Sequence, residues 1–141
     1  MAAEPYRGSI HIAAPPEVVF KYFTCPEALV RWLDEGAVLD PRPGGEFTVR
    51  FRGASVQGRY LEADHPRWIV ISWGRAGSAG FPPGASTLEV TLIPDGEGTT
   101  VQLVHDGLPP SEASRHAQGW AHFLPRLAVA ATGGDPGPDL T

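Results

Sequence analysis

The sequence lacks several features that mark particular classes of protein. Its 141 residues contain one cysteine, Cys25, so no disulfide can form within the chain. No run approaches the roughly 18 consecutive apolar residues of a membrane-spanning helix, and the first residues lack the apolar segment of a secretory signal. Acidic residues outnumber basic ones, 16 to 11, which argues against a nucleic-acid-binding surface across the domain. We therefore expect a cytoplasmic protein with no membrane span and no nucleic-acid partner.

Glycine and proline, in contrast, are abundant. The 17 glycines and 15 prolines interrupt the chain too often for a plain helical bundle. The length suits one domain, and a composition of 42% hydrophobic and 19% charged residues is that of a globular protein. We expect a single domain over residues 1–132 and a disordered tail over residues 133–141, which are rich in Gly, Pro and Asp.

The first part of the chain predicts one strand and two short helices. Residues 6–13 alternate between apolar and polar positions, as a strand does. Residues 15–17 (Pro-Pro-Glu) favour a helix start, because proline is tolerated in the first turn and an acidic side chain there suits the helix dipole. Residues 24–27 (Thr-Cys-Pro-Glu) interrupt this helix and begin a second one, which carries Trp32.

Between residues 36 and 105, apolar residues recur at every second position in short segments. Turn sequences such as residues 95–98 (Asp-Gly-Glu-Gly) separate these segments. Consecutive strands with one apolar and one polar face are typical of an antiparallel sheet that exposes one side to water. The apolar side of such a sheet needs a cover.

Residues 111–132 predict that cover, a single long helix. Its apolar residues recur at helical spacing: Trp120, Phe123, Leu124 and Leu127. About 20 residues at about 1.5 Å each make a helix roughly 30 Å long. Pro125 lies within this helix, where proline removes a backbone hydrogen bond, so we expect a kink near residues 121–123.

Short motifs also recur through the chain in a characteristic order. They lie at residues 12–20, at 24–27 with Trp32, at 42–47 (Arg-Pro-Gly-Gly-Glu-Phe), at 58–62 with Pro66, at 71–73, at 98–101 with His105 and at 119–127. Together with the order of elements, these motifs resemble the START-like (SRPBCC) superfamily, and within it the bacterial homologues of the activator of heat-shock-protein ATPase. The similarity covers roughly residues 8–131, and Phe20 stands where that family often has tryptophan.

The resemblance implies an α+β helix-grip fold. In this fold a curved antiparallel sheet of six or seven strands wraps around a long C-terminal helix, and two short helices follow the first strand. A cavity between sheet and helix opens to solvent at one end. Members of the superfamily bind lipids, sterols, polyketides or hormones, and a few catalyse cyclisation or dehydration, so the resemblance does not imply one activity.

Alternation along the strands and spacing along the last helix define the side chains that face this cavity. The predicted ligand-binding residues are Trp32, Val49, Phe51, Tyr60, Ile71, Trp73, His105, Trp120, Phe123 and Leu124. Large aromatic side chains combined with a few polar ones are typical of pockets for small molecules. The alternative is that the same side chains fill a dry core at normal density.

Two residues are candidates for acid–base chemistry. His105 shares the inward parity of Leu103, and it either orients a ligand, exchanges protons or is a hydrogen-bonded core histidine, which is the commoner case. Glu62 shares the parity of Tyr60, although a β-bulge would turn it outward to solvent. The sequence has no His-Glu-x-x-His and no cysteine pair, so we expect no metal and no other cofactor.

Two aromatic residues outside the predicted set also bear on the cavity. His116 lies one helical turn before Trp120, which brings it within reach of His105. Phe81 belongs to a long hairpin loop over residues 74–85, where it either caps the mouth of the cavity or anchors the loop.

Three functions remain open at this point. The first is the binding of a small hydrophobic or amphipathic molecule in the cavity. The second is a polyketide aromatase/cyclase-type enzyme in which His105 or Glu62 is the acid or base. The third is a protein-interaction module with a chaperone partner, as in the activator for which the family is named. A homodimer is compatible with each of them.

Overall fold

A computed structural model describes residues 4–33, 36–51 and 54–137 of the chain. Its N-terminal part has the predicted strand and two short helices: β1 (Tyr6–Ile12), α1 (Pro16–Thr24) and α2 (Pro26–Leu33). Both helices begin with proline followed by glutamate. The first backbone N–H of a helix has no partner within the helix, so proline costs no hydrogen bond there, and the acidic group lies at the positive end of the dipole. The extended backbone of Cys25 separates them.

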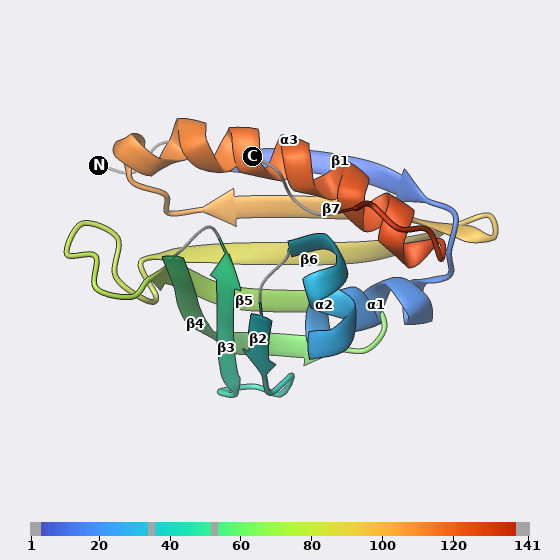
Figure 1. Cartoon of the computed structure of the whole chain (residues 1–141), viewed down its shortest axis with the longest axis horizontal. Helices are drawn as coiled ribbons and strands as arrows, with labels where there is room; N and C mark the ends of the chain where they lie inside the picture. The colour runs from blue at the N-terminus through green and yellow to red at the C-terminus, as the bar shows by residue number, and fades with distance from the viewer. Residues whose placement is uncertain (1–3, 34–35, 52–53, 138–141) are drawn as a thin grey trace.

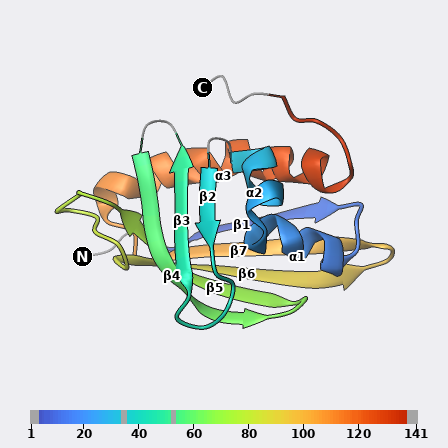
Figure 2. The same ribbon diagram turned by 60° about the horizontal axis from the view of Figure 1, so that its bottom comes forward.

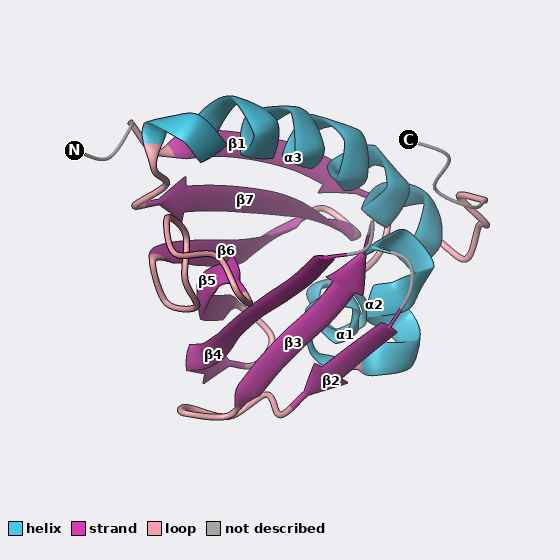
Figure 3. Ribbon diagram, turned by 60° about the vertical axis from the view of Figure 1, so that its left-hand side comes forward, coloured by secondary structure: helices cyan, strands magenta, loops and turns pink. Residues whose placement is uncertain are grey.

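Seven strands form one antiparallel sheet (Figure 1). The six that follow the helices are β2 (Gly36–Leu39), β3 (Glu46–Phe51), β4 (Ala54–Asp64), β5 (Trp68–Arg75), β6 (Ser86–Asp95) and β7 (Gly98–Asp106). The order in the sheet is β1-β7-β6-β5-β4-β3-β2, which leaves β1 and β2 at the edges. Figure 3 shows that β2, β3 and β4 run obliquely to β1 and β7, so the sheet bends around the space beside the last helix.

The last helix, α3 (Pro110–Ala131), lies across the concave face of this sheet (Figure 1). It is continuous through Pro125, and its axis bends gently toward the C-terminal end (Figure 3) without breaking at residues 121–123. Pro125 and Ala121, one turn earlier, both lie on the exposed side of the helix. Water can therefore replace the hydrogen bond that proline cannot make. None of the helices in the described part of the chain has the length and apolar content to span a membrane.

The apolar faces of the sheet and of the three helices enclose one core. Alternate residues of each central strand are buried, as the period of two predicts; on β5, for example, these are Ile69, Ile71 and Trp73. Figure 2 shows α2 beside β2, and α2 also packs against α3, so the short helices close the side of the core that the sheet leaves open. The α+β helix-grip fold is confirmed.

Two further details follow from local geometry. The pairing of β4 with β5 shifts register between Tyr60 and Glu62, and Glu62 is exposed, so the bulge turns that carboxylate to solvent. After α3, Arg126 donates hydrogen bonds to the carbonyl oxygens of Pro136 and Gly137, at 3.2 and 2.8 Å. Residues 138–141 of the predicted tail lie outside the described residues.

Candidate functional site

A cavity of about 340 Å³ lies between α3 and the part of the sheet formed by β4 and β5. Its apolar wall consists of Leu33, Val56, Trp73, Phe81, Trp120 and Phe123. The two indole rings lie 5.5 Å apart between centroids, one from the sheet and one from the helix. At one end the wall becomes polar, with Arg75 from β5 and Arg115 and His116 from α3.

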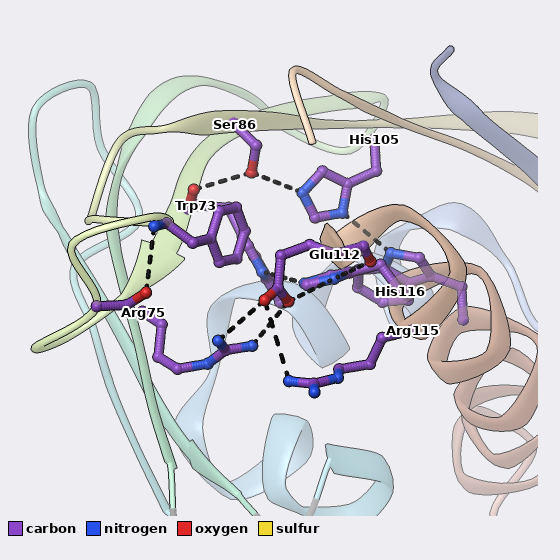
Figure 4. Close-up of polar contacts among 10 residues, drawn as sticks. Trp73, Arg75, Ser86, His105, Glu112, Arg115 and His116 are labelled. Carbon is purple, nitrogen blue, oxygen red and sulfur yellow. Dashed lines mark hydrogen bonds and ion pairs between the residues drawn. The ribbon is translucent and has the colours of Figure 1, made fainter. Parts of the chain in front are cut away.

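His105 lies behind this wall and is fully buried (Figure 4). Trp120 Nε1–H donates to His105 Nδ1 at 3.1 Å, so the ring proton is on Nε2, which donates to Ser86 Oγ at 2.8 Å. The Ser86 hydroxyl in turn donates to the carbonyl oxygen of Trp73 at 2.8 Å. Neither ring nitrogen is left for a ligand, which counts against His105 as an acid or base and identifies it as a hydrogen-bonded core residue.

Burial is also the main reason that His105 stays neutral. It lowers the pKa of His105 to about 3, with a smaller contribution from His116. A protonated ring would have to give up the hydrogen bond that it accepts from Trp120, because both nitrogens would then be donors. His105 is therefore a fixed support for the indole ring rather than a proton carrier at neutral pH.

His116 makes a second indole–imidazole pair on the cavity side (Figure 4). Its Nδ1 lies 3.0 Å from the carbonyl oxygen of Glu112, one turn earlier, and its Nε2 accepts from Trp73 Nε1–H at 3.3 Å. Burial lowers the pKa of His116. The ring centroids of His116 and His105 are 5.1 Å apart, which confirms the approach expected from the sequence.

The charged end of the cavity is organised around one carboxylate (Figure 4). Glu112, in the first turn of α3, accepts two hydrogen bonds from Arg75, at 2.9 Å from Nη2 and 3.2 Å from Nη1. This pair joins the end of β5 to the start of α3, and it holds the pKa of Glu112 below its usual range. Arg115 Nη1 lies 4.0 Å from the same carboxylate.

The β5–β6 loop completes the wall. Phe81 is buried, and its ring centroid lies 5.3 Å from that of His116. The Arg75 guanidinium lies over the Phe81 ring, with Cζ 5.6 Å from the ring centroid. The backbone N–H of Arg75 donates to the carbonyl oxygen of Phe81 at 2.7 Å. Phe81 is thus both a loop anchor and a part of the cavity wall. Within the described residues, no group of three or more His, Cys, Asp or Glu side chains is arranged to hold a metal ion.

Comparison with known families decides the classification. Residues 13–132 match the family model described as "Activator of Hsp90 ATPase homolog 1-like protein" (AHSA1). The chain belongs to the AHSA1-like family. The resemblance found in the sequence motifs is thereby confirmed.

Solved structures related to this AHSA1-like chain share its architecture. An AHSA1-like protein from Rhizobium etli is 38% identical, aligns over 99% of this chain and 92% of that chain, and has a TM-score of 0.74. An Hsp90 activator from Plasmodium falciparum is 26% identical over 90% of this chain and 95% of that one, with a TM-score of 0.75. The Aha1 dimer from Colwellia psychrerythraea, 19% identical over 94% and 98%, shares the fold at a TM-score of 0.79. A search of the curated proteins gives no significant match.

The residues predicted to bind a ligand occupy different places in this AHSA1-like fold. Trp73, Trp120 and Phe123 line the cavity. Six others are buried outside its lining: Trp32, Val49, Tyr60, Ile71, His105 and Leu124. The side chain of Phe51 lies outside the described residues. Two of the buried polar groups are already satisfied, because Tyr60 Oη donates to the carbonyl oxygen of Phe23 at 2.7 Å and Trp32 Nε1 to that of Tyr22 at 2.9 Å.

Several lining residues were missed, although the sequence carried a signal for some of them. Arg75 has the same strand parity as Trp73 and therefore faces the same side. Arg115 and Gly119 lie eight and four residues before Phe123, which was predicted, and this spacing places all three on one face of α3. Arg75 and Arg115 are charged, so a prediction based on apolar positions alone left them out of the cavity wall. For Leu33 and Val56 the pattern identifies a core position and nothing more.

Proposed function

We propose that this AHSA1-like protein binds a small apolar or amphipathic molecule in the cavity between α3 and the sheet. The observation that carries the proposal is a space of about 340 Å³ whose wall is aromatic and apolar and whose polar groups lie at one end. This volume falls within the roughly 300–1,000 Å³ of small-molecule pockets. The free thiol of Cys25 fits a protein of the reducing cytoplasm, the compartment in which we propose that it acts.

Gly119 supports this function from the helix side. A glycine inside a helix costs roughly 0.5–1 kcal/mol relative to alanine, yet Gly119 lies in the middle of the 22-residue helix α3. A β-carbon at this position would meet no atom within 4 Å, and Gly119 belongs to the cavity wall. The missing side chain therefore enlarges the cavity at the expense of helix stability.

Replacing Gly119 by leucine is expected to block the cavity without harming the fold. Ligand affinity should fall at least about tenfold because the new side chain occupies the space, while the melting temperature should stay the same or rise because leucine favours helix. The ligand is first found with a panel of fatty acids, aromatic polyketides and flavonoids, by thermal shift and by quenching of the indoles of Trp73 and Trp120.

The matched control is Gln118→Leu, a change on the exposed side of the same helix that should leave affinity unchanged. Equal affinity of the Gly119→Leu variant and the wild type would place the ligand elsewhere. Failure of the whole panel to bind the wild type would remove the proposal.

A chaperone-activating role is the second candidate. The observation that favours it is the 26% identity to the Hsp90 activator from Plasmodium falciparum across 90% of this chain. Stimulation of the ATPase of an Hsp90-type chaperone by the purified chain would support it. The dimer of the Colwellia psychrerythraea relative makes a homodimer the oligomeric state to test alongside, by light scattering.

The cyclase-type alternative loses its two candidate groups, because His105 is saturated with hydrogen bonds and Glu62 is exposed.

A further inference from the structure

The polar end of the cavity, formed by Arg75, Arg115 and His116, is its mouth, because the side chain of Arg115 is exposed there. This mouth is positively charged, although the chain carries a formal net charge of −5. Two guanidinium groups, those of Arg75 and Arg115, share the single carboxylate of Glu112. The fourth titratable group of this cluster, His116, is held neutral mainly by burial, which lowers its pKa, and its Nε2 accepts a hydrogen bond from Trp73. One positive charge is therefore left without a counter-ion in the cluster.

The uncompensated charge belongs to Arg115. Arg75 is committed to Glu112 through both terminal nitrogens. Arg115 lines the cavity, yet its side chain is 69% exposed and its nearest approach to Glu112 is 4.0 Å, beyond hydrogen-bond distance. It makes no hydrogen bond with any residue in the described part of the chain. Its planar set of donors is thus available to a ligand at the rim.

The interior of the cavity, in contrast, offers nothing to an anion. The two indole N–H groups on its wall are already donated, that of Trp73 to His116 and that of Trp120 to His105. The remaining wall is aliphatic or phenyl: Leu33, Val56, Phe81 and Phe123. Because a buried charge without a partner is strongly unfavourable, a charged group can only remain at the mouth.

We infer that the ligand is an amphipathic anion whose carboxylate pairs with Arg115 at the mouth while its apolar body lies in the cavity against Trp73 and Trp120. This inference rests on the proposed function and specifies the ligand class. A guanidinium fork matches the planar carboxylate in a bidentate geometry. The apolar body has to fit a space equal to about eleven molecules of liquid water, each taking roughly 30 Å³, which suits a bicyclic aromatic ring or a medium-length acyl chain.

A pair of probes that differ in charge alone tests this inference. The probes are 2-naphthylacetate and its neutral amide, titrated into the full chain by calorimetry. The acid should bind up to about fivefold more tightly than the amide at low salt, the upper end of the range for an exposed charge pair. Raising the ionic strength from about 0.01 M to about 1 M should weaken the acid and leave the amide unchanged.

Two variants of the charged cluster should change the affinity for the acid in opposite directions. Arg115→Gln should weaken the acid about fivefold and change the amide less than about twofold. Glu112→Gln releases Arg75 from its ion pair and should strengthen the acid, measured at a temperature at which the less stable variant is folded. Arg7→Gln, an exposed arginine on β1, removes the same charge away from the cavity and should change neither.

The outcomes separate the ligand class from the function. Equal affinity for acid and amide, or an Arg115→Gln variant that binds the acid like the wild type, overturns the anion preference and leaves cavity binding intact. Binding of neither probe, where only neutral members of the panel bind, has the same meaning. Absence of binding by both probes and by the whole panel overturns the proposed function together with this inference.

Discussion

Replacing His105 by glutamine is expected to remove much of the protein's sensitivity to acid. In the folded protein burial lowers the pKa of His105 to about 3, whereas an ordinary histidine titrates at 6.5. Between these two values the unfolded chain binds a proton at this position and the folded protein does not, so acidification favours unfolding. The contribution of His105 to the free energy of unfolding is fully present above pH 6.5 and falls by about 1.4 kcal/mol per pH unit below it. The loss from this residue amounts to roughly 3 kcal/mol at pH 4.

The measurement is urea unfolding at pH 7 and pH 4 for the wild type, His105→Gln and His11→Gln. Glutamine keeps one donor for Ser86 and one acceptor for Trp120 but cannot titrate, so the loss of stability on acidification should shrink by roughly 3 kcal/mol. His11, an exposed histidine on β1, is the control for the same change of side chain outside the buried cluster.

Other groups that face the same cluster remain in all three proteins. The lowered pKa of His116 contributes in the same direction, and the lowered pKa of Glu112 contributes as the pH falls through its folded value, below 4.5. These contributions cancel in the difference between variant and wild type. An undiminished pH dependence in His105→Gln would show that the buried ring is protonated in the folded protein.

The fold was predictable because the signals for its strands, turns and helix starts each lie within a short stretch of sequence. Period-two alternation marks the strands, and glycine and proline mark the turns between them. The Pro-Glu pairs at residues 16–17 and 26–27 mark the first turns of α1 and α2. These signals are read within a few neighbouring residues, and the order in which they occur is specific to the family. The strand order in the sheet then follows, since each strand from β2 to β7 pairs with the next.

The cavity was less predictable because alternation along a strand predicts which side of the sheet a side chain faces but not which residues it contacts there. Tyr60 and Trp73 both point inward from adjacent strands, but Tyr60 donates to the carbonyl oxygen of Phe23, while Trp73 borders the open space. What separates them is the curvature of the sheet and the line along which α3 crosses it. Neither quantity is encoded in a short stretch of sequence.

The chemistry of His105 shows the same limit. Its inward direction followed from parity with Leu103, and its burial is confirmed. Its partners, Ser86 and Trp120, lie 19 and 15 residues away, on another strand and on α3. Only the assembled fold distinguishes a saturated core histidine from an acid–base group facing a pocket.

Replacing Gly74 by alanine is expected to cause the largest loss of stability among single-methyl additions in the β5–β6 region. Gly74 is buried on β5, where a β-carbon would overlap the carbonyl group of Pro82 and approach the Cα of Pro83 to 2.6 Å. Because these are backbone atoms, the loop itself would have to move. We expect a loss of about 3 kcal/mol or more, or roughly 10 °C in the melting temperature.

The matched control lies in the same loop. A β-carbon at Gly80 would meet no atom within 4 Å, so Gly80→Ala should melt at the wild-type temperature or slightly above it. The close approach at Gly74 also matters for the cavity, because it lets the chain fold back so that Phe81 accepts the N–H of Arg75 and reaches the wall. At a temperature where both variants are folded, Gly74→Ala should therefore bind ligand more weakly than Gly80→Ala. Equal melting temperatures for the two variants would mean that the loop yields without cost and that Phe81 is not held in place by this glycine.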